Sequence, residues 1–222
     1  RRRALWAGAF FAFAVALLAA DLIIKYLAFE HVAGPEMPLV LDRRDDGTTL
    51  VQLRRPDGSL VTLPRGPSDH PASAIPRHDE ITVVPHVLSL RLTLNTGAVF
   101  GLGKGKQWIF VIFSLVAAVL IARAFWRCPA GWWMFRLSLA MILAGAMGNL
   151  YDRVRYAAVR DMFHLFPGVE LPFGLQWPGG SELVYPWIFN LADAALVGGV
   201  AILFIIVWRF GWPTQSPGPE PA

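Results

Sequence analysis

The sequence predicts a membrane protein of α+β class overall: an all-α bundle of four transmembrane helices with a small extracytoplasmic β platform. Its composition is the first indication, because hydrophobic residues make up 55% of the 222-residue chain, charged residues make up 16%, and the mean hydropathy is +0.47. The second is that four stretches reach the roughly 20 apolar residues that a helix needs to cross a hydrocarbon core. They are Ala4–Phe29, Gln107–Trp126, Trp132–Tyr151 and Ile188–Trp208.

The first of these stretches has an alternative interpretation as a cleaved signal peptide. It follows Arg1–Arg3 and contains Leu18–Ala20, which resembles a processing site. Its apolar character continues past Asp21 to Phe29, which is longer than the apolar region of such a peptide. We therefore expect a helix that stays in the membrane.

Arginine positions predict the orientation of the four spans. If the spans alternate, Arg1–Arg3, the connection with Arg123, Arg127 and Arg136, and Arg209 all fall on one side. The positive-inside rule makes that side the cytoplasm, so both termini are expected there. The net charge of +4 then reflects topology, and we expect no nucleic-acid partner.

This topology divides the chain into six predicted segments. They are residues 1–29 with the first span, 30–106 as the extracytoplasmic β platform with an insertion at about 35–80, 107–151 with the second and third spans, 152–187 as a second extracytoplasmic segment, 188–210 as the fourth span, and 211–222 as a cytoplasmic tail.

Two patterns within residues 30–106 predict strands. Thr49–Leu63 contains two short apolar runs around a Pro56–Gly58 turn, which is typical of a hairpin. Val87–Leu94 has leucine at every second position, which predicts a half-buried strand. Between them, Pro64–Arg77 is rich in Pro, Ser and His and is expected to be irregular.

Polar residues of the predicted spans gather at one depth, near the outer ends. They are Asp21 and Lys25 on the first span, Asn95 before the second, Asn149, Asp152 and Arg153 at the end of the third, and Asn190 and Asp193 at the start of the fourth. A charge placed in hydrocarbon costs roughly 2.5–3.5 kcal/mol on insertion scales, so such residues usually serve a function. This depth is therefore where we expect a site.

Several of these residues also have purely structural interpretations. Asp21 and Lys25 are spaced for an ion pair on one helical face, and Asn side chains commonly hydrogen-bond between membrane helices. Ala140, Ala144 and Gly148 recur every four residues, which predicts close helix packing. His164 is isolated in the sequence, and the histidines lack the spacing of metal ligands, so we expect no metal and no cofactor.

Asp161 and Asp193 indicate a specific chemistry. Like charges a few ångströms apart cannot both ionise, so two carboxylates that meet would share one proton. The ionised carboxylate can then take a proton from water while the protonated one polarises a carbonyl. No Gly-x-Ser-x-Gly or His-Glu-x-x-His motif offers a competing site. This pattern favours an aspartic protease.

These residues occur in a series of motifs that resembles the lipoprotein signal peptidases (signal peptidase II), bacterial four-span aspartic proteases of the inner membrane. The motifs are Asp21 with Lys25, Asn95–Gly101, Gly145–Arg153, Val159–Asp161 and Phe189–Asp193, in this order. Residues 35–80 and 166–185 look longer than in that family. Their role stays open between a lid, a partner surface and a lineage-specific addition.

The resemblance implies an endopeptidase that cuts prolipoproteins on the N-terminal side of the diacylglyceryl-modified lipobox Cys, near the outer leaflet surface. Asp161 and Asp193 would be catalytic. The resemblance also assigns substrate-binding or dyad-orienting roles to Asn95, Gly97, Asn149, Arg153 and Asn190, and structural support to Asp21, Lys25, Gly145 and Asp152. Lipidated prolipoproteins, membrane lipids and globomycin-type inhibitors are the partners that it implies.

Two other functions are alternatives for the same residues. A small proton-coupled transporter would use the same carboxylates as a relay, but it should carry polar residues through to the cytoplasmic half of the spans. Apart from Ser114 and Ser138, the inner halves of the spans lack them. A membrane scaffold without catalysis would leave the two aspartates unexplained.

Overall fold

The computed structural model describes residues 2–34, 38–46, 48–64, 71–96, 107–129 and 131–213. These residues form helices and two antiparallel sheets. The chain divides into two compact units, which we call the helical unit and the sheet unit. The helical unit comprises Arg1–Leu22, Trp108–Tyr151 and Leu191–Ala222, and the sheet unit comprises Ile23–Gln107 and Asp152–Asn190.

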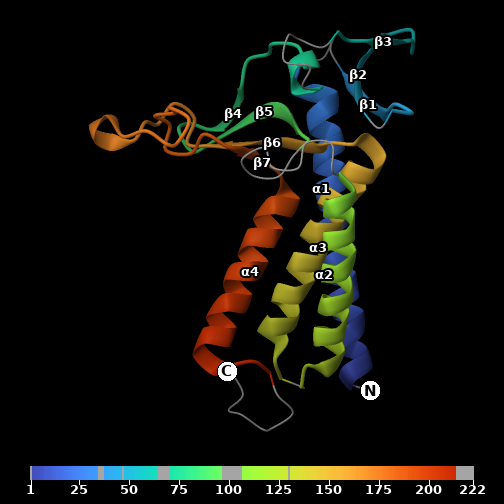
Figure 1. The fold of residues 1–222 in the computed structure, drawn as a ribbon, viewed down its shortest axis with the longest axis vertical. Helices are drawn as coiled ribbons and strands as arrows, with labels where there is room; N and C mark the ends of the chain where they lie inside the picture. Colours follow the sequence, from blue (N-terminus) through green and yellow to red (C-terminus); the bar gives the residue numbers. More distant parts are fainter. Residues whose placement is uncertain are drawn as a thin grey trace. The chain divides into compact units, whose positions relative to one another are not determined.

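Each of the four predicted spans contains a helix (Figure 1). Their bounds are Arg2–His31 for α1, Gln107–Arg127 for α2, Trp133–Tyr156 for α3 and Leu191–Phe210 for α4. Among the described residues, three helices are long and apolar enough to cross a membrane: Ala7–His31 within α1, α3, and α4. The crossing by α2, and with it the four-span bundle, stays a prediction.

Two predicted helix boundaries were wrong. α3 continues past the predicted end at Tyr151 to Tyr156, so Asp152 and Arg153 lie inside the helix, five residues or fewer from its actual end. The apolar run from Ile188 does not start a helix, because Ile188–Phe189 forms strand β7, which pairs with Phe163 and His164. Strand pairing with a distant segment outweighs the continuity of the apolar run. Asn190 therefore directly precedes α4.

The core of the helical unit draws on all four helices. It includes Phe10 of α1, Phe125 of α2, Phe135 and Leu139 of α3 and Ile206 of α4, all of them buried. The rings of Phe10 and Phe125 pack with centroids 4.3 Å apart. Because lipid tails are as apolar as these side chains, close van der Waals packing holds such helices together in a membrane.

Small residues let α3 approach its neighbours closely. Ala140 and Ala144 are buried, which confirms the close packing predicted from their spacing. A Cβ atom at Gly145 would overlap the backbone oxygen of Ala192 on α4, and one at Gly148 would lie 2.5 Å from Oδ2 of Asp21. Only glycine fits these two positions without displacing a backbone or a buried carboxylate.

The Gly145→Ala variant is expected to lose about 1–3 kcal/mol of unfolding free energy, because overpacking a close contact forces backbone shifts. The matched control is Gly8→Ala on α1, where a Cβ meets nothing within 4 Å. Alanine is the better helix former, by about 1 kcal/mol, so Gly8→Ala should leave stability unchanged or raise it. Thermal unfolding of both variants in the same detergent tests this expectation, and equal stability of the two would contradict it.

The sheet unit contains a three-stranded antiparallel sheet in the order β1-β2-β3. Its strands are β1 (Leu39–Arg43), β2 (Thr49–Arg54) and β3 (Leu60–Thr62). β2 and β3 confirm the predicted hairpin, with Gly58 in the left-handed region at a φ of 83°. Strand β1 was not predicted. A short 3-10 helix, η1 (Pro71–Ala74), lies in the stretch expected to be irregular.

A four-stranded antiparallel sheet in the order β4-β5-β6-β7 completes the sheet unit (Figure 1). Its strands are β4 (Ile81–Val84), β5 (Leu88–Asn95), β6 (Val159–Leu165) and β7. β5 confirms the strand predicted from alternating leucines, whereas β6 and β7 were missed. The register between β5 and β6 shifts between Leu90, opposite Phe163, and Thr93, opposite Asp161, which marks a β-bulge.

The core of the sheet unit joins both sheets to the last turns of α1. Phe29 of α1 and Val32 just after it pack with Leu41 of β1, Leu94 of β5 and Met162 of β6. Met162 has no exposed surface, and Leu94 is 1% exposed. The sheet strand that carries Asp161 is thus anchored by a well-packed apolar face.

Candidate active site

Asp161 lies in the middle of β6 rather than in a loop. Val159, Arg160, Asp161 and Met162 are all buried, so this strand is covered on both faces. The Asp161 side chain is 2% exposed. Its Oδ1 accepts a hydrogen bond of 2.6 Å from Nδ2 of Asn190, which also donates to the backbone oxygen of Arg160 at 3.3 Å. Asn190 is fully buried, so this amide fixes the carboxylate against its own strand.

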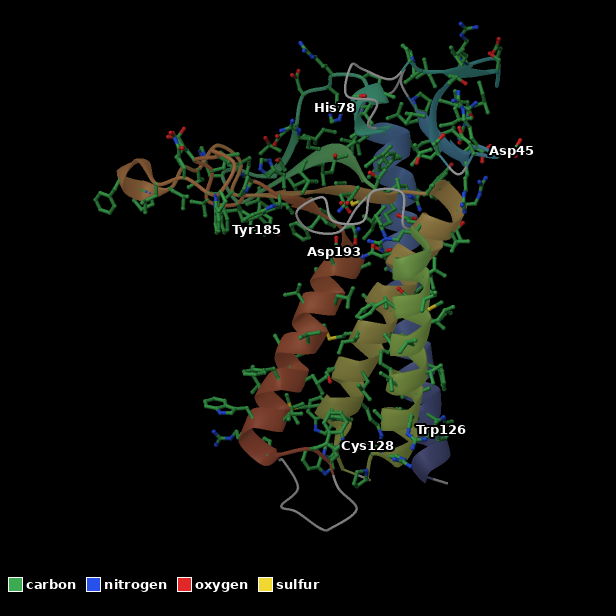
Figure 2. The ribbon with its side chains drawn as sticks, in the orientation of Figure 1. Asp45, His78, Trp126, Cys128, Tyr185 and Asp193 are labelled. Atoms are coloured by element: carbon green, nitrogen blue, oxygen red, sulfur yellow. The ribbon has the colours of Figure 1, made fainter. Side chains whose placement is uncertain are left out.

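Asp193 lies in the first turn of α4 and is half-buried (Figure 2). Its Oδ1 accepts a hydrogen bond of 2.7 Å from Nδ2 of Asn149 on α3. The free backbone N–H groups at the start of a helix attract negative charge. The helical unit therefore presents a carboxylate held by an asparagine and placed where a helix favours an anion.

The two predicted catalytic aspartates thus share one arrangement, in which a buried asparagine amide donates to one carboxylate oxygen. Hydrogen bonds to a charged group contribute about 1.5–3 kcal/mol and fix side-chain direction. The contacts of Asn149 and Asn190 agree with the orienting role predicted for them. The roles themselves, and the meeting of Asp161 with Asp193, stay predictions.

A buried salt-bridge cluster lies in the sheet unit around Asp152. Nζ of Lys25 is 3.3 Å from Oδ2 of Asp152, and Nη2 of Arg160 is 2.8 Å from Oδ1. The backbone N–H of Arg160 also donates to Oδ2 at 3.0 Å. Lys25 and Asp152 have no exposed surface. Two cations thus face one carboxylate, and the second cation, Arg160, directly precedes Asp161 in β6.

The chain reversal after α3 makes this cluster possible. Ala157 follows the helix in the left-handed conformation, with a φ of 58°, and its N–H donates to the backbone oxygen of Arg153 at 3.0 Å. This geometry ends many helices, although glycine usually occupies the position. The guanidinium of Arg160 then stacks over the Tyr156 ring, 4.6 Å from its centroid. The sequence indicated Arg160 only as the cation next to Asp161, because its partner Asp152 lies on the preceding helix.

Asp21 supports the start of α4 within the helical unit. Its Oδ1 accepts a hydrogen bond of 2.9 Å from the backbone N–H of Ala192, one of the N–H groups that a helix leaves without an internal partner. Gly148 leaves room for the carboxylate, and Gly145 leaves room for the Ala192 backbone. Asp21 and Gly145 therefore both contact the turn that carries Asp193.

The other residues predicted for substrate binding or dyad orientation are Asn95, Arg153 and Gly97. Asn95 ends β5 opposite Val159 and is exposed. Arg153 is half-buried in the last turns of α3. Gly97 lies outside the described residues. Thr93, which sequence reasoning missed, lies directly opposite Asp161. Its position two residues before Asn95 on a strand was the only available signal.

His164, which is isolated in the sequence, has a partner far along the chain. Its Nδ1 lies 3.0 Å from Oε2 of Glu80, which also accepts a hydrogen bond from the Ser89 hydroxyl. Arg91 approaches the same carboxylate at 3.4 Å. Burial raises the pKa of Glu80, but the hydrogen bonds from Ser89 and His164 and the charges of His164 and Arg91 outweigh it, and the pKa falls below its usual range. This network ties the segment before β4 to β6.

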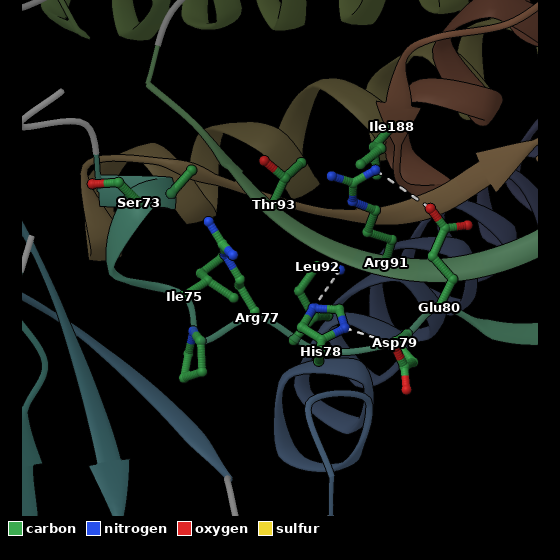
Figure 3. Close-up of a pocket in the computed structure, with 12 residues that line it drawn as sticks. Ser73, Ile75, Arg77, His78, Asp79, Glu80, Arg91, Leu92, Thr93 and Ile188 are labelled. Carbon is green, nitrogen blue, oxygen red and sulfur yellow. Dashed lines mark hydrogen bonds and ion pairs between the residues drawn. The ribbon is translucent and has the colours of Figure 1, made fainter. Parts of the chain in front are cut away.

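A cavity of about 960 Å³ opens in the sheet unit (Figure 3). Its wall includes Ser73, Arg77, Glu80, Arg91, Thr93 and Ile188. Thr93 belongs both to this wall and to the strand pair that carries Asp161. Part of the wall comes from residues 72–80, the end of the predicted insertion.

Comparison with known proteins decides the family. The sequence model described as Signal peptidase (SPase) II matches residues 70–209, more than half of the chain. The chain belongs to the signal peptidase II family. Residues 70–209 include both candidate catalytic aspartates and the two asparagines bonded to them.

Individual members of the signal peptidase II family agree with this assignment. The lipoprotein signal peptidase of Desulfitobacterium hafniense is 33% identical over 58% of this chain and 74% of its own. That of Moorella thermoacetica is 35% identical over 65% of this chain and 82% of its own. Family membership makes this signal peptidase II relative a protease of bacterial membranes, consistent with its apolar helices.

Solved structures support the same fold. A bacterial membrane enzyme determined by the in meso method at 2.3 Å is 20% identical, covers 91% of this chain and 88% of its own, and gives a TM-score of 0.57. A second, at 1.9 Å, is 22% identical with a TM-score of 0.55, and covers 91% of this chain and 94% of its own. The overall fold of this signal peptidase II family member is thus similar to that of two solved bacterial membrane enzymes.

Proposed function

We propose that this chain is an intramembrane aspartic endopeptidase that removes signal peptides from diacylglyceryl-modified prolipoproteins, cutting on the N-terminal side of the lipidated Cys. The observation that carries the proposal is the pair of carboxylates, Asp161 and Asp193, each fixed by a hydrogen bond from an asparagine amide. Both lie in the region matched to signal peptidase II. The curated relatives that match are called lipoprotein signal peptidases.

Chain connectivity supports the meeting of the two carboxylates. Asn190 donates to Asp161, and Asp193 follows Asn190 by only three residues. Consecutive Cα atoms are 3.80 Å apart, so the Cα atoms of Asn190 and Asp193 are at most about 11 Å apart. Asp193 is therefore close along the chain to the residue that holds Asp161.

In the proposed reaction the two aspartates share one proton and hold a water molecule between them. The ionised carboxylate takes a proton from the water, which attacks the scissile carbonyl. The protonated carboxylate donates to the carbonyl oxygen and the proton then passes to the leaving amine. The cavity beside Thr93 offers room for substrate residues next to the cleaved bond.

The proposed topology has four spans, α1 to α4, with both termini in the cytoplasm. It adds α2 to the three helices that are long and apolar enough to cross a membrane. Arg127 at the end of α2 and Arg209 at the end of α4 support this orientation by the positive-inside rule. Residues 30–106 and 152–187 are then extracytoplasmic, and the site lies near the outer leaflet surface. Lipids and globomycin-type inhibitors are the expected ligands at this depth.

The decisive experiment compares a diacylglyceryl-modified prolipoprotein with its unlipidated form as substrates of the purified chain. Mass spectrometry should show a single cut before the Cys of the lipidated form, at least tenfold faster than any cut in the unlipidated form. Globomycin should block it. Equal cleavage of the two substrates, or cleavage elsewhere, would refute the proposed specificity.

A further inference from the structure

The segment between β6 and β7, residues 166–187, forms a projecting arm (Figure 1). We call it the aromatic arm. Its two legs run antiparallel, because the N–H of Leu171 donates to the oxygen of Glu182 at 2.6 Å and that of Val184 donates to the oxygen of Val169 at 2.8 Å. A short 3-10 turn, η3 (Pro172–Gly174), lies at the tip. The arm thus has a defined backbone rather than an irregular one.

The tip presents bulky apolar side chains to its surroundings. Phe173 is 98% exposed and Leu175 is 58% exposed. Phe173 also takes the left-handed conformation, with a φ of 62° and a ψ of 23°, which is costly for a large side chain without a partner. Residues 171–181 contain no charged residue. A strained and uncharged apolar tip indicates a contact with an apolar partner.

Aromatic rings continue from the tip to the base of the arm. Trp177 packs on Trp187 with centroids 4.8 Å apart, Trp187 on Tyr185 at 5.3 Å, and Tyr185 on Phe189 of β7 at 5.9 Å. The indole N–H of Trp177 already donates to the oxygen of Leu183 at 2.9 Å. The ring can therefore enter a less polar layer without losing a hydrogen bond. Trp and Tyr are enriched where a membrane meets water.

The chain connects this arm to a membrane span almost directly. β7 ends at Phe189 and α4 begins at Leu191. α4 is apolar enough to cross a membrane, and Val197, Phe204 and Trp208 expose 66–82% of their surface on it, as lipid-facing side chains do. The base of the arm therefore lies, along the chain, at the point where a span enters the bilayer.

We propose that the tip of the aromatic arm inserts into the interfacial layer of the bilayer, on the side where α4 begins, as a membrane contact in addition to the spans. Residues 166–187 contain two glutamates, Glu170 and Glu182, and no Lys or Arg. The contact is therefore apolar, suits zwitterionic phosphatidylcholine, and is insensitive to salt. It does not depend on the proposed peptidase activity.

Site-directed spin labelling of the full chain in phosphatidylcholine nanodiscs tests this proposal. The single native thiol, Cys128, is buried and is first replaced by Cys128→Ala. Labels are then placed at Phe173→Cys and Leu175→Cys, with Ser59→Cys in the exposed β2–β3 turn as the control. Collision with oxygen, relative to a water-soluble nickel chelate, should be at least tenfold higher at 173 and 175 than at 59, and unchanged in 0.5 M salt.

Three outcomes would overturn the proposal. Labels at 173 and 175 as accessible to nickel as the label at 59 would place the tip in water. Protection that appears only when a prolipoprotein is added would make the substrate the partner. Spin–spin broadening between labels at 173 would make a second copy of the chain the partner. None of these readouts depends on cleavage, so they test the membrane contact independently of the proposed peptidase activity.

Discussion

Replacing either Asp161 or Asp193 by Asn is expected to lower prolipoprotein cleavage by about a thousandfold or more, while the protein still folds. Each carboxylate is proposed to transfer a proton, and a positioned proton donor or acceptor contributes about 10²–10⁴ in rate. Asn is close in shape to Asp, and its side-chain oxygen can still accept from Asn190 or Asn149. Single-turnover cleavage of a lipidated substrate measures the effect.

The control for this pair is Asp45→Asn, which removes an exposed carboxylate from the sheet unit and should leave the rate unchanged. Thermal stability of the two dyad variants should be unchanged or higher, since one of two mutually unfavourable carboxyl groups is replaced by a neutral amide. Substantial cleavage by either variant would contradict the assignment of Asp161 and Asp193 as the catalytic pair. A loss of stability in both, with cleavage intact, would give these aspartates a structural role.

The Asp152→Ala variant is expected to lose about 3–5 kcal/mol of unfolding free energy, the typical effect of removing one partner of a buried ion pair. Asp152 has no exposed surface and lies between Nζ of Lys25 at 3.3 Å and Nη2 of Arg160 at 2.8 Å. Its removal leaves two buried cations without that carboxylate. The displaced Arg160 directly precedes Asp161, so cleavage should fall as well. Unfolding followed by circular dichroism in detergent measures the loss.

An exposed pair in the same unit provides the matched control. Asp42 contacts Nη1 of Arg155 at 2.6 Å, with both side chains about half exposed. Exposed pairs of this kind contribute about 0.2–1 kcal/mol, so Asp42→Ala should change stability little. If the Asp42 and Asp152 variants lost the same stability, burial would not be the reason for the effect. The Lys25→Met variant should lose less than Asp152→Ala, because Asp152 keeps Arg160.

The sequence predicted those parts of the fold whose signals are local. Length and hydropathy located the helices, the Pro56–Gly58 turn located the β2–β3 hairpin, and alternating leucines located β5. Strand β6 was not predicted, because apolar and polar residues do not alternate along it. Arg160, Asp161 and His164 are buried in it, each with a partner far along the chain, and no local pattern encodes such partners.

The candidate site likewise has features with local sequence signals, which were predicted, and features without them, which were not. Motif order identified Asp161, Asp193 and the asparagines, because family motifs are local in sequence. Which asparagine serves which aspartate could not be read, since both pairs join distant segments. Lys25 was predicted to pair within its own helix, and the structure adds Asp152 as its partner. Helical spacing reveals neighbours on one helix only.

The bulge in β5 has a consequence for tolerance to insertion and deletion. Ladder pairs on its two sides differ by one residue in register, so an uninterrupted strand would set Leu92, not Thr93, across from Asp161. A one-residue slip that removed the bulge would thus set an isobutyl group instead of a hydroxyl across from the carboxylate and turn core leucines toward the wrong face. We expect loop lengths to vary among relatives, whereas the number of residues between the positions of Leu90 and Asn95 should be the same in all of them.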